Sequence, residues 1–140
     1  MSDFNVAIVN DASTDETRET ALRAISNDSR FNIINVKSNC GAMSSIVRGI
    51  NHLAPNDNDI VVTIDGDDML NIPNALEIVR KTYERTDCLM TYGNFITQEG
   101  KTIMPNVGKR HQQRVIDQNL FRKAPWISTH LKTFKYILYS

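Results

Sequence analysis

Short apolar runs that alternate with helical patterns constrain the fold of this chain more than any other feature of its sequence. Strands are predicted over Asn5 to Asn10, Phe31 to Val36 and Asp59 to Ile64, with helices over Asp15 to Ile25 and Ala42 to Leu53 between them. Such alternation favours βαβ units, which pair their strands in parallel and place helices on the faces of the sheet. The predicted fold class is therefore α/β, a three-layer α/β/α sandwich with a mainly parallel sheet.

The second half of the chain has a less regular pattern. A third helix is expected from Pro73, which is tolerated in a first helical turn, to about Arg85. A strand over Cys88 to Tyr92 follows, and then a hairpin over Asn94 to Met104 that turns at Gln98-Glu99-Gly100-Lys101. Residues 105 to 125 are polar and partly basic. The apolar residues beyond them fit either a buried helix face or a strand followed by a helix: Trp126, Ile127, Leu131, Phe134 and Leu138.

An acidic cluster follows the third predicted strand. Asp65-Gly66-Asp67-Asp68 sets three carboxylates within four residues at the end of an apolar, β-branched run. Like charges this close repel one another unless solvent or a cation screens them. Ligands of open parallel sheets bind beyond the carboxyl ends of the strands, and Mg²⁺ or Mn²⁺ there takes oxygen ligands. The cluster therefore predicts a metal site, with a solvated turn that leads into a helix as the alternative.

A second strand end is also acidic. Val9-Asn10-Asp11-Ala12-Ser13-Thr14-Asp15 ends the first strand and enters a polar helix, which Ser13 or Thr14 is expected to cap. Right-handed crossovers would gather Asp11 and Asp67 at one edge of the sheet. The neighbouring, mainly parallel strands are expected to hold Ile8, Ile33, Val62 and Leu89. Asn10 and Asp11 can alternatively serve only to cap the turn.

Composition and charge exclude some classes of function. The 140 residues have a formal net charge of 0, so no overall field attracts nucleic acid, and nucleic-acid binding is not expected. No apolar run approaches the roughly 20 residues of a membrane span. Cys40 and Cys88 are isolated, and the amino terminus lacks the features of a signal peptide. A location in the reducing cytoplasm is therefore expected.

Three motifs in order over residues 5 to 70 carry a resemblance to a known family. Val9 to Asp15 resembles the V-D-D-G-S-T-D segment of the inverting, nucleotide-sugar-dependent glycosyltransferases of family 2, which have the GT-A fold. Asp65 to Asp68 resembles their D-x-D motif. Between them, Asn39-Cys40-Gly41 followed by Gly49-Ile50 resembles an N-x-G…G-I segment. Ser128 to Phe134 is similar to an S-H-L-R-T-F segment of some members.

The resemblance implies a reaction and a set of site residues. A sugar would pass from a nucleotide-diphosphate sugar to an acceptor of unknown identity. A uridine diphosphate sugar is the first expectation for the donor. Mn²⁺ or Mg²⁺ held by Asp67 and Asp68 would stabilise the charge that grows on the leaving diphosphate. The nucleotide-sugar-binding residues that the resemblance implies are Asn10, Asp11, Ser13, Asn39, Gly41, Arg48 and Asp65.

The chain also departs from the family pattern. Asn10 replaces the first acid of the V-D-D triplet, which leaves base selectivity open. Ile46-Val47 stands where many members carry Arg-Asn, with Arg48 adjacent. An inverting mechanism needs a general base, and the candidates Asp117 and His130 lie in no segment that resembles the family's base motif. Relative to the family, the domain is expected to be truncated at both ends.

These observations predict one GT-A-like domain over residues 1–140, with a nucleotide-sugar-binding part over about 1–104 and the start of an acceptor-side part over about 105–140. Two functions stay open. The chain is either a glycosyltransferase, acting alone, as a homo-oligomer or with a complementing chain, or a catalytically inactive binding or assembly module. Phosphoryl chemistry at Asp65 to Asp68 is a third class, which lacks supporting residues elsewhere in the sequence.

Overall fold

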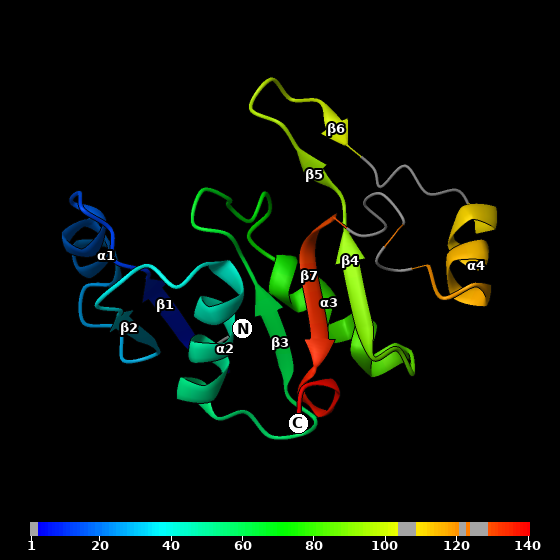
Figure 1. Cartoon of the computed structure of the whole chain (residues 1–140), viewed down its shortest axis with the longest axis horizontal. Coiled ribbons are helices and arrows are strands. Elements are labelled where there is room, and N and C mark those ends of the chain that lie inside the picture. Colours follow the sequence, from blue (N-terminus) through cyan, green and yellow to red (C-terminus); the bar gives the residue numbers. More distant parts are fainter. Residues whose placement is uncertain (1–2, 104–108, 121–122, 124–128) are drawn as a thin grey trace. The chain divides into compact units, whose positions relative to one another are not determined.

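The computed structural model describes residues 3–103, 109–120, 123 and 129–140 (Figure 1). The chain folds as two compact units, Met1–Asp59 and Ile60–Ser140. No helix in the described part of the chain has both the length and the apolar character that crossing a bilayer requires.

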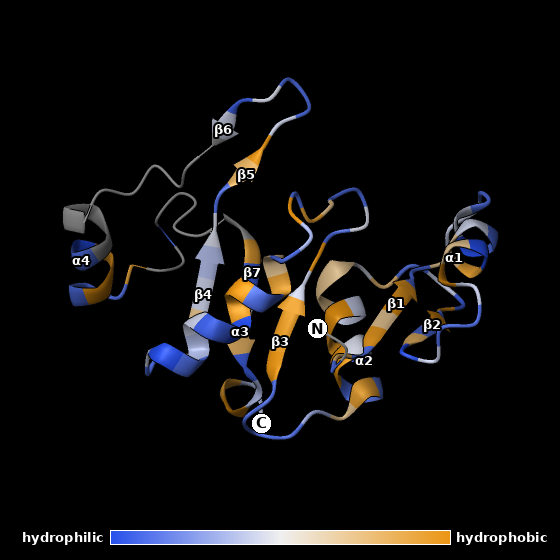
Figure 2. Ribbon diagram, turned by 180° about the vertical axis from the view of Figure 1, so that it is seen from behind, coloured by the Kyte–Doolittle hydropathy of each residue, from blue (hydrophilic) through white to orange (hydrophobic). Residues whose placement is uncertain are grey.

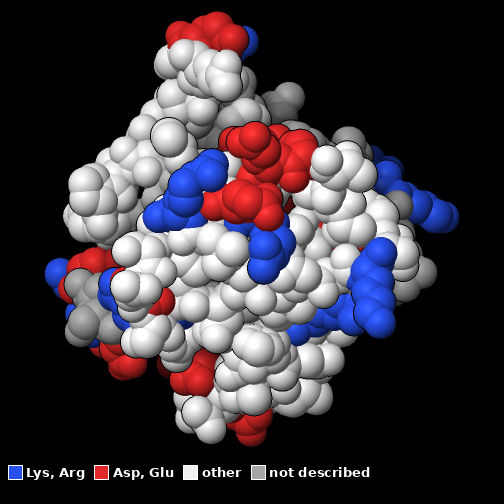
Figure 3. Space-filling model, turned by 90° about the vertical axis from the view of Figure 1, so that its left-hand side faces the viewer, with Lys and Arg blue, Asp and Glu red and all other residues white. Residues whose placement is uncertain are grey.

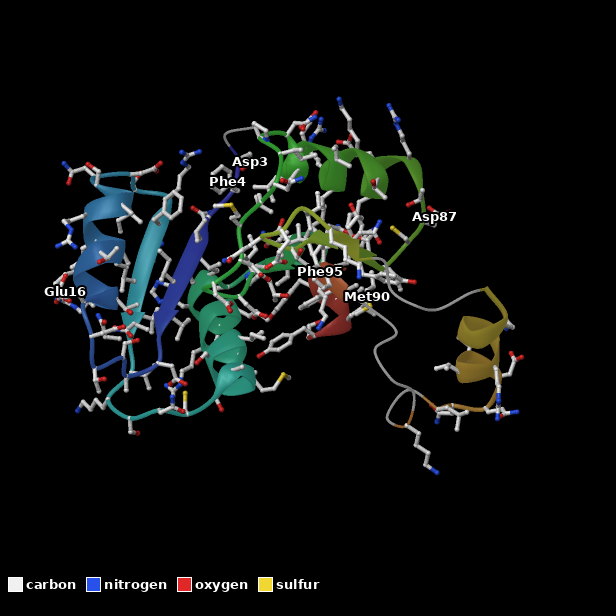
Figure 4. All side chains as sticks on the ribbon, turned by 90° about the horizontal axis from the view of Figure 1, so that it is seen from above. Asp3, Phe4, Glu16, Asp87, Met90 and Phe95 are labelled. Atoms are coloured by element: carbon white, nitrogen blue, oxygen red, sulfur yellow. The ribbon has the colours of Figure 1, made fainter. Side chains whose placement is uncertain are left out.

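The first unit is a βαβα arrangement built on a parallel pair of strands. Its elements in chain order are β1 (Val6–Asn10), α1 (Thr17–Ile25), β2 (Phe31–Asn35) and α2 (Ala42–Leu53). β1 and β2 are parallel, with Ile8 opposite Ile33 and Asn10 opposite Asn35. This pairing confirms the predicted βαβ unit. Figure 4 shows the two strands between α1 and α2.

Helix α2 packs closely on β1 because a glycine faces the strand. Gly49 is buried, and a Cβ atom added there would lie 3.4 Å from Val9 Cγ2 and 3.7 Å from the Ala7 Cβ atom. Side chains alternate between the two faces of a strand, so Ala7, Val9 and then Asp11 lie on the face toward α2. Asn10 and Ile8 therefore lie on the opposite face.

The second unit contains a mixed set of strands and helices. Its elements are β3 (Ile60–Thr63), α3 (Ala75–Arg85), β4 (Met90–Gly93), β5 (Phe95–Ile96), β6 (Thr102–Ile103), α4 (Lys109–Asp117), β7 (Thr129–Lys135) and a short 3₁₀ helix (Tyr136–Leu138). β5 and β6 form the predicted hairpin, and Gly100 in its turn has a φ of 79°, a conformation that favours glycine. The strand followed by a helix, the second of the two alternatives for the end of the chain, is confirmed.

The position of β7 corrects the predicted strand order. β7 is antiparallel to both β3 and β4 and lies between them. β3, which holds Val62, and β4, which begins directly after Leu89, are therefore not neighbours as predicted. Figure 2 shows β3, with the sequence Ile-Val-Val-Thr, as hydrophobic. β4 has alternately exposed residues, as suits an edge strand, whereas β7 pairs with a strand on each side. The α/β class is confirmed, and the sheet of this unit is antiparallel.

Local boundaries also differ from the prediction at some helix starts. α1 begins at Thr17, and neither Ser13 nor Thr14 caps it; Asp15 Oδ1 instead accepts the Thr17 amide at 3.1 Å. α3 begins two residues after Pro73. α4 lies in the segment that the sequence left unassigned, and Trp126 and Ile127 lie outside the described residues.

Three hydroxyl groups connect the elements of the second unit. The Tyr83 hydroxyl on α3 lies 2.8 Å from Thr133 Oγ1 on β7, which lies 2.6 Å from Thr91 Oγ1 on β4. Thr133 is completely buried, and Tyr83 is 7% exposed. Buried polar groups are costly unless they are hydrogen-bonded, so this chain of hydroxyls fixes how α3 sits on the sheet.

We expect Thr133→Val to destabilise the protein by about 1–3 kcal/mol, because it leaves the Tyr83 hydroxyl buried without its partner. The free energy of unfolding in urea measures the effect. Thr82→Val is the control, since the Thr82 hydroxyl donates to the Ile78 carbonyl within its own helix. Equal stability of the two variants would contradict a structural role for the hydroxyl chain.

Candidate functional site

The end of β1 is joined to the turn before α2 through Asp11. Both carboxylate oxygens of Asp11 are engaged: Oδ1 accepts the Cys40 amide at 2.8 Å and the Cys40 thiol at 3.0 Å, and Oδ2 accepts the Gly41 amide at 2.8 Å. Asn39 Nδ2 donates to the Asp11 carbonyl at 3.4 Å. Asp11 therefore holds three consecutive residues, Asn39 to Gly41, against the strand end.

These contacts explain the ionisation of Asp11 and the glycine at position 41. Hydrogen bonds from the Cys40 thiol and from the Cys40 and Gly41 amides favour the charged carboxylate and lower the pKa of Asp11. Gly41 has a φ of 82°, in the left-handed region that side chains disfavour. The N-x-G segment is thus a turn whose shape depends on Gly41 and on the charge of Asp11.

We expect Asp11→Asn to lower the melting temperature at neutral pH, because an amide cannot accept all these donors. The carboxylate contributes stability above its ordinary pKa of 3.8, and that contribution is lost as the pH falls through the lowered folded-state value. The gap between wild type and variant should therefore close in acid. Asp57→Asn is the matched control, since Asp57 makes no hydrogen bond or ion pair within the described residues. A gap that stays constant with pH would contradict this account.

Asn10 makes two side-chain contacts at the same strand end. Its Oδ1 accepts the Ser13 amide at 3.1 Å, and its Nδ2 donates to Asn35 Oδ1 at 3.1 Å. Asn35 ends β2 in register with Asn10 and is exposed. Sequence reasoning missed Asn35, although a polar residue at the carboxyl end of the strand that pairs with β1 is a signal that could have identified it.

The other predicted residues of the first unit are accessible. Ser13 and Arg48 are both exposed. Arg48 lines a shallow depression on α2 together with Met43, Ser44 and Val47. On the face shown in Figure 3, Lys and Arg side chains lie among Asp and Glu side chains, so this face has no continuous basic surface of the kind that nucleic acids bind.

The acidic cluster of the second unit is an exposed turn after β3. The Asp68 amide donates to the Asp65 carbonyl at 3.1 Å, and Asp65, Asp67 and Asp68 are all exposed. Within the described residues, no three His, Cys, Asp or Glu side chains are grouped so that they could hold a metal ion by themselves. Magnesium is usually bound by one or two carboxylates with water and substrate phosphates, and adjacent exposed carboxylates fit that mode.

Strand β7 brings two further residues toward this turn. Thr63, the last residue of β3, pairs with Lys132 of β7, and Thr63 Oγ1 donates to the Lys132 carbonyl at 3.4 Å. Beyond this pair the chain leaves β3 for the acidic turn, while β7 includes His130, two residues before Lys132. Lys132 is exposed, and sequence reasoning missed it because its position depends on the pairing of strands far apart in the chain.

The remaining candidates are placed differently. Asp117 ends α4, is exposed and accepts a hydrogen bond from Gln113 Nε2 at 2.7 Å on its own helix. Asp11 and Asp67 belong to different compact units, so their common edge stays a prediction. The structure brings Asn10, Asp11, Asn39 and Gly41 together in the first unit, and Asp65, Asp67 and Asp68 in the second.

Comparison with known proteins gives one match. The sequence model described as glycosyl transferase family 2 matches residues 1–139, nearly the whole chain. No curated protein and no solved structure matches the chain significantly. The family match covers both compact units and every candidate residue described above.

Proposed function

Because the chain belongs to glycosyl transferase family 2, we propose that it transfers a sugar from a nucleotide-diphosphate sugar to an acceptor with inversion at the anomeric carbon. The family acts in glycosyl transfer and binds nucleotide-sugar donors. The match over residues 1–139 is the observation that carries the proposal. The exposed acidic turn directly after β3 supports it, since its carboxylates can hold a divalent cation, and a leaving diphosphate needs positive charge nearby.

The metal belongs to the donor side of this proposal. Asp67 and Asp68 would hold Mn²⁺ or Mg²⁺, which supplies Lewis-acid stabilisation of the leaving diphosphate when bound. Members of the family commonly use a divalent metal. Asp65 would contact the ribose hydroxyls or a water on the metal. Lys132, whose backbone is held beside the end of β3, would add a further positive charge for the phosphates.

The first unit would contact the nucleoside. Asn10, Asn39 and the exposed Ser13 offer hydrogen-bonding groups at the end of β1, and Arg48 offers a positive charge on α2. Asp11 contributes by holding the turn Asn39 to Gly41 in place. Uridine diphosphate is the proposed nucleotide of the donor.

The acceptor side depends on a general base. Of the two candidates, the position of β7 favours His130, because His130 lies two residues from Lys132, which pairs with the last residue of β3 before the acidic turn. Asp117 is bound to Gln113 at the end of a separate helix. His130 would take the proton from the acceptor hydroxyl as the new bond forms.

Cys40 and Cys88 are free thiols, which agrees with the proposed location in the reducing cytoplasm. Self-association or a complementing chain belongs to the proposal as well, because β1 pairs only with β2 among the described strands and so has one open edge. The mass of the protein in solution would show whether the chain self-associates.

The experiment that tests the proposal is incubation of the protein with radiolabelled nucleotide sugars, a panel of acceptor sugars and Mn²⁺, with and without a chelator. We expect metal-dependent transfer, with the anomeric configuration of the product inverted in its NMR spectrum. Binding of the donor without transfer to any acceptor would support the catalytically inactive binding module instead. A retained configuration would contradict the inverting mechanism.

A further inference from the structure

We propose that Tyr92 on β4 binds a sugar ring of the acceptor, and that the acceptor is a saccharide of two or more rings. This inference rests on the proposed glycosyl transfer and names the acceptor class that the proposal leaves open. Tyr92 lies on the face of the sheet opposite α3, in a row of side chains that leads across the second unit to the acidic turn.

The row follows from the position of Thr133, the central residue of the buried hydroxyl chain. Thr133 on β7 is opposite both Val62 on β3 and Thr91 on β4. Its hydroxyl lies 2.8 Å from that of Tyr83, so its side chain points toward α3, which lies behind these strands in Figure 1 and in front of them in Figure 2. Successive side chains of a strand alternate between its two faces. The adjacent residues on the side of the acidic turn therefore share the face opposite α3: Thr63, Lys132 and Tyr92.

An irregularity in the strand pairing coincides with Tyr92. The register between β4 and β7 shifts between Thr91 and Gly93, the two residues that flank Tyr92. Such irregularities re-aim side chains and are frequent beside active sites. Tyr92 is 40% exposed although it is aromatic and belongs to a sheet, so a ligand can reach it.

The groups in this row suit a sugar. A sugar ring has an apolar face of C–H groups and a rim of hydroxyls, and a tyrosine likewise combines an apolar ring with a polar tip. Lys132 is exposed and can donate to sugar hydroxyls, while Thr63 Oγ1, which donates to the Lys132 carbonyl, can still accept a hydrogen bond. Aromatic surface with a few hydrogen-bonding groups beside it is the usual composition of a small-molecule site.

The position of Tyr92 sets the size of the acceptor. Neighbouring strands lie about 4.8 Å apart, and β7 separates β4 from β3, so Tyr92 lies about 10 Å across the sheet from Thr63. The acidic turn follows Thr63 directly after Ile64. A single sugar ring that receives the transferred sugar beside this turn does not span that distance. Tyr92 therefore contacts a ring further along the saccharide.

The test is NMR titration of the protein, loaded with Mn²⁺ and uridine diphosphate, with mono-, di- and trisaccharides of glucose, galactose, mannose and N-acetylglucosamine. In wild type we expect at least one di- or trisaccharide to bind about tenfold more tightly than its monosaccharide, because a second ring contacts Tyr92. Tyr92→Ala should abolish this gain and leave the affinity for uridine diphosphate unchanged. Tyr92→Phe should retain the gain, because phenylalanine keeps the ring.

Met90→Ala is the matched control. Met90 is 57% exposed and lies on the same strand and face as Tyr92, one row further from the acidic turn and opposite Phe134. This variant should keep the tenfold gain. Circular dichroism checks that each variant is folded, and Tyr92→Leu, which keeps apolar bulk without a flat ring, replaces Tyr92→Ala if the alanine variant does not fold.

The outcomes separate this inference from the proposed function. If wild type binds uridine diphosphate but no saccharide, or binds longer saccharides no more tightly than monosaccharides, the inference is overturned and donor binding stands. If wild type binds neither nucleotide nor saccharide, the proposed function fails and takes the inference with it. If folded Tyr92→Ala keeps the gain, or Met90→Ala loses it to the same extent, Tyr92 is not the sugar contact. The loss in Met90→Ala would indicate an apolar partner on this face instead.

Discussion

Asp67→Asn is expected to abolish the stabilisation of this protein by Mn²⁺ together with uridine diphosphate. A ligand present at about 100 times its dissociation constant adds about 2.7 kcal/mol to the stability of the form that binds it. Asp67 is exposed beside Asp68 in the turn after β3, and an amide is a far weaker ligand than a carboxylate for a hard divalent cation. Thermal unfolding with and without metal and nucleotide measures the difference.

The design needs a control that removes a charge without touching the turn. Asp87→Asn serves, because Asp87 is an exposed carboxylate of the same compact unit that follows α3 (Figure 4). It should keep the full shift in melting temperature, and Mn²⁺ without nucleotide should give a smaller shift than the two together. A full shift in Asp67→Asn would contradict the metal-binding role of the turn.

His130→Ala is expected to lower the turnover number by about 10²- to 10⁴-fold, the range typical for the loss of a general base. Binding of the donor should persist, since His130 is not among the proposed donor contacts. His130→Gln should be equally slow, because glutamine cannot take a proton.

Asp117→Asn is the comparison for this prediction. Asp117 accepts a hydrogen bond from Gln113 on α4, and its replacement should leave the turnover number close to that of wild type. Loss of turnover in Asp117→Asn together with full activity in His130→Ala would reverse the assignment of the base.

The local elements of this protein could be predicted because they depend on neighbouring residues. Helix α2 has the predicted bounds. Gly41 allows the positive φ directly before the helix, and the buried residues of the helix are Gly49 and Ile50. The hairpin at Gly100 was predicted from its turn residues. Helix starts were less accurate: α1 begins at Thr17, whose amide donates to Asp15 Oδ1, and neither Ser13 nor Thr14 caps it.

The acidic turn and the Asp11 segment could also be located in the sequence, because each directly follows an apolar strand. The roles within the segment could not. Asp11 and Asn10 are adjacent and chemically similar, and only their opposite faces on β1 give one to the turn before α2 and the other to Asn35. Contacts between residues 25 or more positions apart decided this division.

By itself, the sequence determined the βαβ start of the chain, its first three helices and the two polar strand ends, since periodicity and turn chemistry act over a few residues. The tertiary structure alone decided that β7 lies between β3 and β4, and so brought Lys132 beside Thr63. The physical reason is that a strand satisfies its hydrogen bonds with any partner of suitable register, and the partner is chosen by packing across the whole unit.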